Sequence, residues 1–285
     1  MLTDFKREWL SLTLGDDFMF GKVFQDEALC LELIRLILPE LDIERVEFPE
    51  RQKTLTEGIF MRGVRFDIYT RTDKGEIIDV EIQTADTGNL AKRIRAYHSM
   101  ITRSEMDIRK MKNYNDIHKA YVIFICLFDL FDKGRHIYTF RNICREDTSI
   151  ELNDGAVTIF LNAKGIADDV SPKMKAFLNL IMGIRSEDSF VKRLEAKMEE
   201  VLMTPEMEWE YWAHRTREQD YFNRGKNEGL SLGRLEGLSL GRLEGLSLGR
   251  LEGQHEIAGR MRNAGFSDEQ ICNLTGLSPD ELRNI

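Results

Sequence analysis

The segment VRFDIYTRTDKGEIIDVEIQ, residues 64–83, predicts two short strands joined by a tight turn. Apolar side chains occupy every second position, at residues 64, 66 and 68 and again at 78, 80 and 82. A period of two is typical of strands with one apolar and one polar face. The join Asp73-Lys74-Gly75 suits a three-residue hairpin loop with Gly75 in the left-handed conformation.

The hairpin register follows from the turn. A loop centred on Lys74 pairs Thr72 with Glu76, which places Asp67 opposite Glu81 and Arg65 opposite Gln83 on one face. Directly opposed carboxylates repel each other, and a divalent cation between them would offset that repulsion. The alternative is a solvated hairpin whose polar face carries acids, because Asp and Glu are common on exposed faces.

The order of these residues resembles the core of the PD-(D/E)XK nuclease superfamily, an Asp followed by a short turn and Glu-x-Gln on the next strand. The surrounding segments are similar to one bacterial branch, the recombination-promoting nuclease/transposase family. Besides residues 64–83, the matching segments are GDDFMFGKVF (15–24), KRIRAYHSM (92–100), LFDLFDKGRHIYTF (127–140), DGAVTIFLNAKG (154–165) and GFSDEQICNLTGLSPDEL (265–282).

This resemblance implies an α/β fold with a restriction-endonuclease-like core, a mixed sheet flanked by helices, and a helical C-terminal extension. It implies that Asp67 and Glu81 are metal ligands and that the carbonyl group of Ile82 completes the protein contribution. The implied ion is Mg²⁺, with Mn²⁺ or Ca²⁺ as alternatives. Asp17 matches an early helical acid that commonly joins the site. The N-cap of its helix is the preferred alternative role, and the two roles can coexist.

Gln83 stands where the superfamily usually has a lysine. Glutamine carries no charge, but it can orient water by hydrogen bonds, so we count it with Asp67 and Glu81 as catalytic. Arg65, Lys92 or Arg93 could supply the missing charge. Arg65 and the basic stretch that follows the hairpin, Lys92, Arg93 and Arg95, are expected to bind nucleic acid, and the family match favours phosphate contacts by Arg93 and Arg95. An ordinary solvated helix face is the alternative.

Composition excludes some classes of protein. A net charge of -9 over 285 residues argues against a protein that coats nucleic acid nonspecifically, but it leaves a nuclease with acidic metal ligands open. The four cysteines lie far apart without a CxxC motif, as in a reduced cytoplasmic protein of bacteria. No apolar stretch approaches the ~20 residues that span a bilayer, and no secretory signal is visible, so we expect no membrane association.

Hydrophobic patterning divides the chain into four parts. Residues 1–170 are expected to form the nuclease-like core, residues 171–224 a helical extension packed on it, residues 225–253 a repeat arm, and residues 254–285 a small helical element. Helices are predicted at 16–38, 89–112, 172–183, 187–203 and from Pro205 onward. Strands are predicted at 43–48, 58–71, 76–83, 120–127, 136–140 and 156–161.

The repeat arm contains GLSLGRLE three times in tandem, at 229–236, 237–244 and 245–252. Glycine occupies every fourth position, and each glycine destabilises an isolated helix by roughly 1 kcal/mol relative to alanine. A row of glycines also allows two helices to approach closely, and the leucines between them would then be buried. The arm is therefore either a self-association element or a flexible spacer, and we favour a homo-oligomer formed through residues 225–285.

Together these features predict a metal-dependent DNA endonuclease of low sequence specificity, linked to recombination or mobile elements. The alternative is a non-catalytic nuclease-like scaffold that binds DNA or protein through its helical tail. Metal binding by Asp67 and Glu81 in the folded protein separates the two.

Overall fold

The computed structural model describes residues 4–47, 50–51, 54–55, 64–65, 67–106 and 113–284. The chain divides into two compact units, Met1–Tyr211 and Trp212–Ile285, and each is described by itself. None of the helices in the described ranges is long and apolar enough to cross a membrane.

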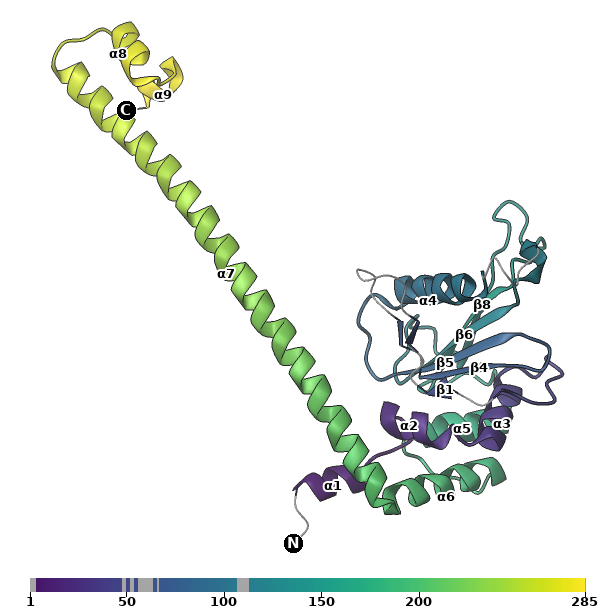
Figure 1. The fold of residues 1–285 in the computed structure, drawn as a ribbon. Helices are drawn as coiled ribbons and strands as arrows, with labels where there is room; N and C mark the ends of the chain where they lie inside the picture. The colour runs from purple at the N-terminus through teal and green to yellow at the C-terminus, as the bar shows by residue number, and fades with distance from the viewer. Residues whose placement is uncertain are drawn as a thin grey trace. The chain divides into compact units, whose positions relative to one another are not determined.

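A six-stranded mixed sheet forms the centre of the first unit, in the order β1-β4-β5-β6-β8-β7 (Figure 1). The middle strands β5, β6 and β8 are parallel, whereas β1, β4 and β7 pair antiparallel with their neighbours. Every residue of β6 is buried, as expected for a strand with neighbours on both sides and helices on both faces. The strands are β1 (Glu50–Arg51), β4 (Ile68–Arg71), β5 (Ile77–Gln83), β6 (Ala120–Cys126), β7 (Ile137–Phe140) and β8 (Ala156–Asn162).

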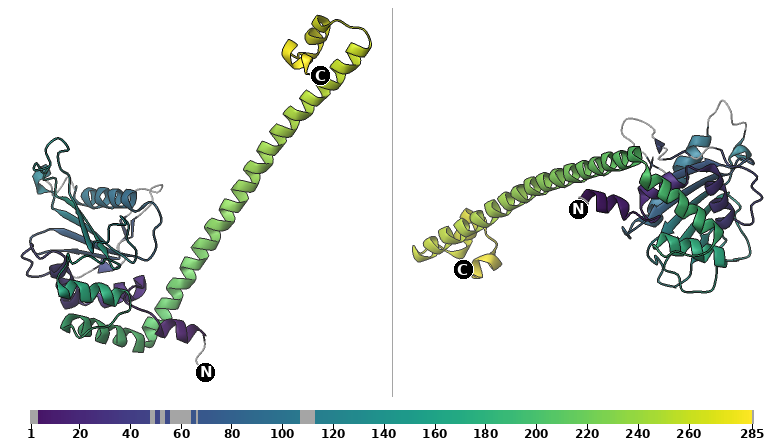
Figure 2. Two further views of the ribbon diagram at one scale, coloured as in Figure 1. Left: turned by 180° about the vertical axis from the view of Figure 1, so that it is seen from behind. Right: turned by 90° about the horizontal axis from the view of Figure 1, so that it is seen from below.

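Helices cover both faces of this sheet (Figures 1 and 2). Helix α4 (Leu90–Glu105) lies on one face and packs on β6. On the other face lie α2 (Asp17–Val23), α3 (Glu27–Ile37) and α5 (Pro172–Ile181), and α6 (Ser189–Met203) packs on α2 and α5 as an outer layer. The first unit also contains α1 (Asp4–Leu10), the short 3₁₀ helix η1 (Tyr114–Asp116) and the start of α7 (Pro205–Asn263). The mixed sheet with helices on both faces confirms the α/β fold class.

The hairpin register is confirmed by the pairing of β4 with β5. Ile68 pairs with Val80 and Tyr69 with Asp79, which is the register set by a loop centred on Lys74. Gly75 has a φ of 92°, and a Cβ atom there would lie 2.5 Å from the Cδ2 atom of His118. Both the left-handed backbone and the close ring therefore require glycine at the turn.

The predicted pairing of Arg65 with Gln83 is wrong. Arg65 belongs to β3 (Val64–Arg65), which pairs with β2 (Thr54–Leu55) in a separate two-stranded sheet. The pairing of β4 with β5 ends at Ile68, and the amide group of Asp67 donates a hydrogen bond to the side chain of Glu81. Because the amide group of Asp67 bonds to a side chain instead of extending the β-ladder, β4 begins only at Ile68.

Two other local predictions are wrong. The helix predicted over 16–38 is two helices, because the side chain of Asp26 accepts hydrogen bonds from the amides of Ala28 and Leu29 and starts α3 as a new helix. The strand predicted over 43–48 is a single bridge between Val46 and Thr72, and residue 48 lies outside the described residues. The predictions over 58–63 and 107–112 also lie outside them.

The remaining elements agree with the sequence patterns. The strands predicted at 120–127, 136–140 and 156–161 are β6, β7 and β8, and the helices predicted at 172–183 and 187–203 are α5 and α6. Ser171 and Asp188 cap these two helices with their side chains, and Pro172 occupies the first turn of α5.

In the second unit the GLSLGRLE repeat is helical throughout, because α7 runs from Pro205 to Asn263 without a break. The helix does not decide between a self-association element and a spacer, and both stay predictions for this segment. The C-terminal helices α8 (Asp268–Thr275) and α9 (Pro279–Arg283) form a small core with the end of α7, made of Ala258, Ile271, Leu277 and Leu282. Capping boxes start both helices, at Ser267 and Ser278, as their sequences predict.

Candidate metal centre

Asp67 and Glu81 meet where the β4–β5 hairpin ends, and a main-chain amide from the facing segment donates a hydrogen bond to each carboxylate. The amide group of Asp67 donates to Oε1 of Glu81 at 2.9 Å. The amide group of Ile82 donates to Oδ2 of Asp67 at 3.1 Å. The two carboxylates are thus fixed by main-chain donors at the point where the two strands separate.

Glu81 is almost fully buried, with 3% of its surface exposed. The hydroxyl group of Tyr97 donates to Oε2 at 3.1 Å, and Nη2 of Arg93 lies 3.6 Å from the same oxygen. Burial, reinforced by the negative charge of Asp67, raises the pKa of Glu81 to about 8. The carboxylate form is therefore costly at neutral pH unless another positive charge is present.

Asp79 is a third acid on this face, and sequence reasoning gave it no role. It lies two residues before Glu81 on β5, so both side chains point to the side of the sheet that α4 covers. Its exposed fraction is 0%, and neither carboxylate oxygen has a hydrogen-bond partner within the described part of the chain. Burial raises the pKa of Asp79 well above its usual value, and the nearby Glu81 and Asp67 raise it further.

Gln83, the next residue on this face, is tied to α4. Its Oε1 accepts a hydrogen bond from Nη1 of Arg93 at 2.8 Å, and its Nε2 donates to the carbonyl of Ala85 at 2.7 Å. Nη2 of Arg93 donates to the hydroxyl of Tyr97 at 3.0 Å. The guanidinium group also lies over two aromatic rings, 5.6 Å from the centroid of Tyr97 and 5.5 Å from that of Phe124.

Tyr97 therefore links the cation to the acid. Its hydroxyl group accepts from Arg93 and donates to Glu81, and burial together with the charge of Glu81 raises the pKa of Tyr97. Tyrosine therefore stays protonated and keeps its donor. The sequence offered one signal, because Arg93 and Tyr97 are four residues apart and share one helix face.

The other candidate residues lie elsewhere. Lys92 and Arg95 are exposed on α4. Asp17 is the exposed first residue of α2, its Oδ1 atom accepts from the amide of Phe18, and Asp16 is the N-cap. The side chain of Arg65 lies outside the described residues. The structure thus brings together Asp67, Glu81, Gln83 and Arg93 of the predicted set.

This set of donors fits a hard divalent cation. Asp67 and Glu81 offer carboxylate oxygens, which Mg²⁺, Mn²⁺ and Ca²⁺ prefer, whereas zinc sites usually include histidine or cysteine. Within the described residues neither Asp79 oxygen has a hydrogen-bond partner, and burying a carboxylate in this way is costly unless a positive charge compensates it or the group takes up a proton. The raised pKa of Glu81 has the same origin, so a cation would stabilise the ionised form of this face.

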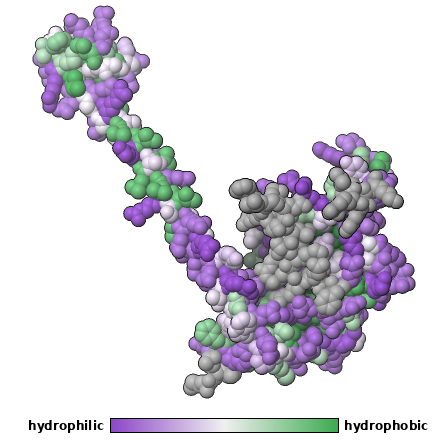
Figure 3. Space-filling model, viewed as in Figure 1, coloured by the Kyte–Doolittle hydropathy of each residue, from purple (hydrophilic) through white to green (hydrophobic). Residues whose placement is uncertain are grey.

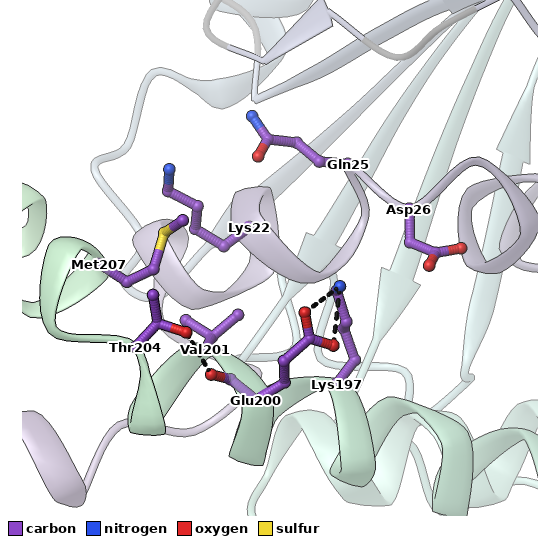
Figure 4. A pocket seen from close by; sticks show the side chains of 8 residues that line it. All are labelled: Lys22, Gln25, Asp26, Lys197, Glu200, Val201, Thr204 and Met207. Atoms are coloured by element: carbon purple, nitrogen blue, oxygen red, sulfur yellow. Dashed lines mark hydrogen bonds and ion pairs between the residues drawn. The ribbon is translucent and has the colours of Figure 1, made fainter.

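A pocket on the other side of the sheet does not share these properties. It lies between α2, α6 and the start of α7, with a volume of about 180 Å³ (Figure 4). Nζ of Lys197 donates to both carboxylate oxygens of Glu200, at 2.9 and 3.0 Å, and Nζ of Lys22 donates to Glu210 at 2.6 Å. Its charged side chains already have partners within the protein, since Asp26 accepts from the amides of Ala28 and Leu29, so it is a weaker candidate for ligand binding.

Comparison with known proteins identifies a family. The family model described as "PD-(D/E)XK nuclease family transposase" matches residues 15–228, which include every residue of the candidate metal centre. No curated protein and no solved structure matches the chain.

Proposed function

The chain belongs to the PD-(D/E)XK nuclease family of transposases, and from this premise we propose that it is a metal-dependent DNA endonuclease of low sequence specificity. The observation that carries the proposal is the pairing of Asp67 with Glu81 through main-chain donors at the end of a hairpin. Nucleases of this family generally use divalent metals. This protein would act in the bacterial cytoplasm, on DNA that undergoes recombination or carries mobile elements.

Asp67 and Glu81 would hold the ion, preferably Mg²⁺. When bound, such a cation stabilises charge on a phosphoryl group and makes nearby water more acidic. The protein contributes the fixed position of the two carboxylates. A proton on Glu81 must leave before the carboxylate can act as a ligand, and the hydrogen bond from Tyr97 favours that ionised form.

The DNA backbone would approach from the side of α4. Lys92 and Arg95 are exposed there, and each can attract phosphates without reading sequence. Arg65, in β3, would add a further positive charge; β3 contacts α4. Phosphate contacts of this kind agree with low sequence specificity.

The test is cleavage of supercoiled plasmid by purified full-length protein with Mg²⁺, with EDTA, and with the variants Asp67→Asn and Glu81→Gln. We expect metal-dependent nicking that each variant reduces by at least 100-fold, with circular dichroism unchanged. Asp42 is an exposed acid that pairs with Lys74 in the hairpin loop, at the opposite end of the hairpin from Asp67 and Glu81, so Asp42→Asn should cleave like the wild type. Absence of cleavage and of metal binding in the wild type would favour the scaffold alternative, and equal cleavage by all variants would indicate a contaminant.

We further propose that the chain forms a homo-oligomer through residues 225–285. The repeat exposes its leucines along α7, where apolar side chains gather on the surface (Figure 3). Leu230, Leu238 and Leu246, which occupy equivalent positions in the three repeats, are 63–64% exposed. A second copy has the same spacing of glycine and leucine, so it could cover this surface with matching contacts.

Light scattering on the full-length protein tests this proposal. Replacing Leu235, Leu243 and Leu251 together by glutamine keeps helix propensity and removes apolar surface. We expect the variant to have a lower molar mass in solution than the wild type at equal concentration. Equal masses would contradict association through the repeat.

A further inference from the structure

Gln83 leaves the metal centre without the cation that the usual motif provides, and the structure contains a cation close to that position. The Nη1 atom of Arg93 lies 2.8 Å from the side-chain oxygen of Gln83. Arg93 comes from α4, ten residues further along the chain. We propose that the Arg93 guanidinium takes the place of the motif lysine and contacts the phosphate that is cleaved, with Gln83 as its positioning residue. This inference rests on the proposed nuclease function.

The first support is geometric. Arg93 is held by Gln83 on one side and by Tyr97 on the other, and its Nη2 atom lies 3.6 Å from Oε2 of Glu81. Its guanidinium lies over the rings of Tyr97 and Phe124, so its plane is constrained as well. A cation fixed beside a metal-binding carboxylate is well placed to stabilise charge that develops during hydrolysis.

The second support is unused hydrogen-bonding capacity. Arginine has five N–H donors, and the described contacts to Gln83 and Tyr97 use two of them. About one third of the side chain, 34%, is exposed. A guanidinium with free donors and an exposed edge can bind a phosphate through two parallel hydrogen bonds.

The third support explains why residue 83 is glutamine. Its amide is oriented, because Nε2 donates to the carbonyl of Ala85 while Oε1 accepts from Arg93. A lysine at this position would place a second positive charge next to the guanidinium and would offer it no acceptor. The glutamine and the arginine are thus complementary, and we expect them to depend on each other.

Lys92 and Arg95 are the natural comparison. Both are exposed cations on α4, adjacent to Arg93 or two positions away, and neither has a described bond to Gln83, Tyr97 or Glu81. Arg95→Met therefore removes the same charge from the same helix as Arg93→Met without touching the network. It is the matched control for every measurement below.

The experiment measures single-turnover cleavage with Mg²⁺, DNA affinity with Ca²⁺ in place of Mg²⁺, and Mn²⁺ affinity by calorimetry. We expect Arg93→Met to lower the cleavage rate constant by about 10²–10³-fold, the usual cost of one charge-stabilising group. It should weaken DNA binding by less than tenfold and leave Mn²⁺ affinity within threefold of the wild type or tighter. Arg95→Met should weaken DNA binding, because Arg95 is an exposed phosphate contact, and should lower the rate constant at least tenfold less than Arg93→Met does.

A residue swap tests the dependence of Gln83 on Arg93. Gln83→Lys alone should lower the rate constant at least tenfold, because two cations then compete for one position. The double variant Gln83→Lys/Arg93→Met restores the usual motif, and we expect it to cleave at least tenfold faster than Arg93→Met alone. A structural role for Arg93 would predict no such rescue.

The inference is overturned if Arg93→Met and Arg95→Met cleave alike, if Arg93→Met loses Mn²⁺ affinity as Asp67→Asn does, or if the double variant shows no rescue. Failure of the proposed function gives a different result, in which the wild type does not cleave at all. The DNA affinities then decide whether Arg93 contacts phosphate, since Arg93→Met must bind DNA more weakly than the wild type. A wild type that neither cleaves nor binds DNA contradicts both proposals.

Discussion

The acidic face of β5 buries charged side chains, whereas the repeat of α7 exposes apolar ones, so both regions depart from the usual placement of side chains. On β5, Asp79 and Glu81 are charged groups with 0% and 3% of their surface exposed. On α7, Leu235 and Leu243 are apolar groups with 62% and 65% exposed. Charged residues are almost never fully buried unless they are paired, and large apolar patches are rarely left in water.

The difference indicates what kind of binding partner would stabilise each region. The buried acids have one protein cation nearby, because Nη2 of Arg93 lies 3.6 Å from Oε2 of Glu81, and a bound divalent cation would stabilise their ionised forms further. The exposed leucines lie on a helix with open space around its glycines, so what they lack is another surface. The first region predicts an ion and a reaction, and the second predicts a partner of protein size.

The largest contrast concerns packing. Phe124 is 0% exposed, and its ring contacts those of Tyr97 and Phe160 at centroid distances of 5.8 and 6.2 Å. We expect Phe124→Ala to lower the free energy of unfolding by about 3–5 kcal/mol, the usual cost of such a cavity. Leu243→Ala should change it by less than about 0.5 kcal/mol, as for other exposed sites.

Urea denaturation at low protein concentration measures both variants. A larger loss in the free energy of unfolding for Leu243→Ala than for Phe124→Ala would contradict the contrast between the buried and the exposed region. If the cost of Leu243→Ala rises with protein concentration, the comparison is sharpened, because the leucine is then covered by a second chain.

The next effect is a pH dependence that the acidic face should create in the metal-free protein. The pKa of Glu81 is about 8 in the folded state, against an ordinary value of 4.5. Between these values the native state holds a proton that the unfolded state has lost, so stability is complete below pH 4.5 and falls as the pH rises through 8. One pKa unit corresponds to about 1.4 kcal/mol, so the loss should reach a few kcal/mol.

Denaturation in EDTA at pH 5 to 9 gives this slope. Glu81→Gln removes the titrating group and should make the slope shallower, and excess Mg²⁺ should reduce the loss in the wild type. Identical slopes for the wild type and Glu81→Gln would show that Glu81 does not titrate in this window.

The hairpin could be predicted from sequence because its determinants are local. The alternation of residues 78–83 sets the faces, and the turn at Gly75 sets the register. Asp67 and Glu81 therefore came together as predicted. The pairing of the residues before Asp67 could not be predicted in this way. The amide group of Asp67 donates to the side chain of Glu81, which ends the β-ladder, and Arg65 pairs with β2 instead.

The rest of the site depends on tertiary packing. An acid in an alternating strand reads as solvent-exposed, and Asp79 is buried because α4 covers this face of the sheet. The sequence likewise showed that Lys92, Arg93 and Arg95 are basic, but only the position of α4 selects Arg93 for the acidic face. The break between α2 and α3 was missed because the cap formed by Asp26 lies within a continuous apolar pattern.

A smaller effect is expected for Asp79→Asn. The ionised carboxyl group has no hydrogen-bond partner in the described part of the structure, and the protonated group bonds to Glu81. An isosteric amide removes the ionisable group and can still donate to Glu81. We expect the free energy of unfolding in EDTA to stay constant or to rise by about 1–2 kcal/mol. Glu105→Gln is the control, because Glu105 bonds to Arg71 and His118 and its replacement should destabilise the fold.

Denaturation at pH 8 compares the two variants. If Asp79→Asn destabilises as much as Glu105→Gln, then Asp79 has a structural partner and the acidic face is less strained than its burial suggests.

The smallest effect concerns the glycines of the repeat. A Cβ atom at Gly233, Gly237 or Gly241 would meet no heavy atom within 4 Å, and all three residues are helical. Each Gly→Ala change should therefore stabilise α7 by about 0.5–1 kcal/mol, seen as a higher midpoint of helix melting by circular dichroism. Gly276→Ala is the control and should destabilise, because Gly276 caps α8 with a φ of 75°. If the triple variant melts higher yet loses mass in light scattering, the glycines serve the close approach of a second helix, and the exposed leucines have their partner in another copy of this chain.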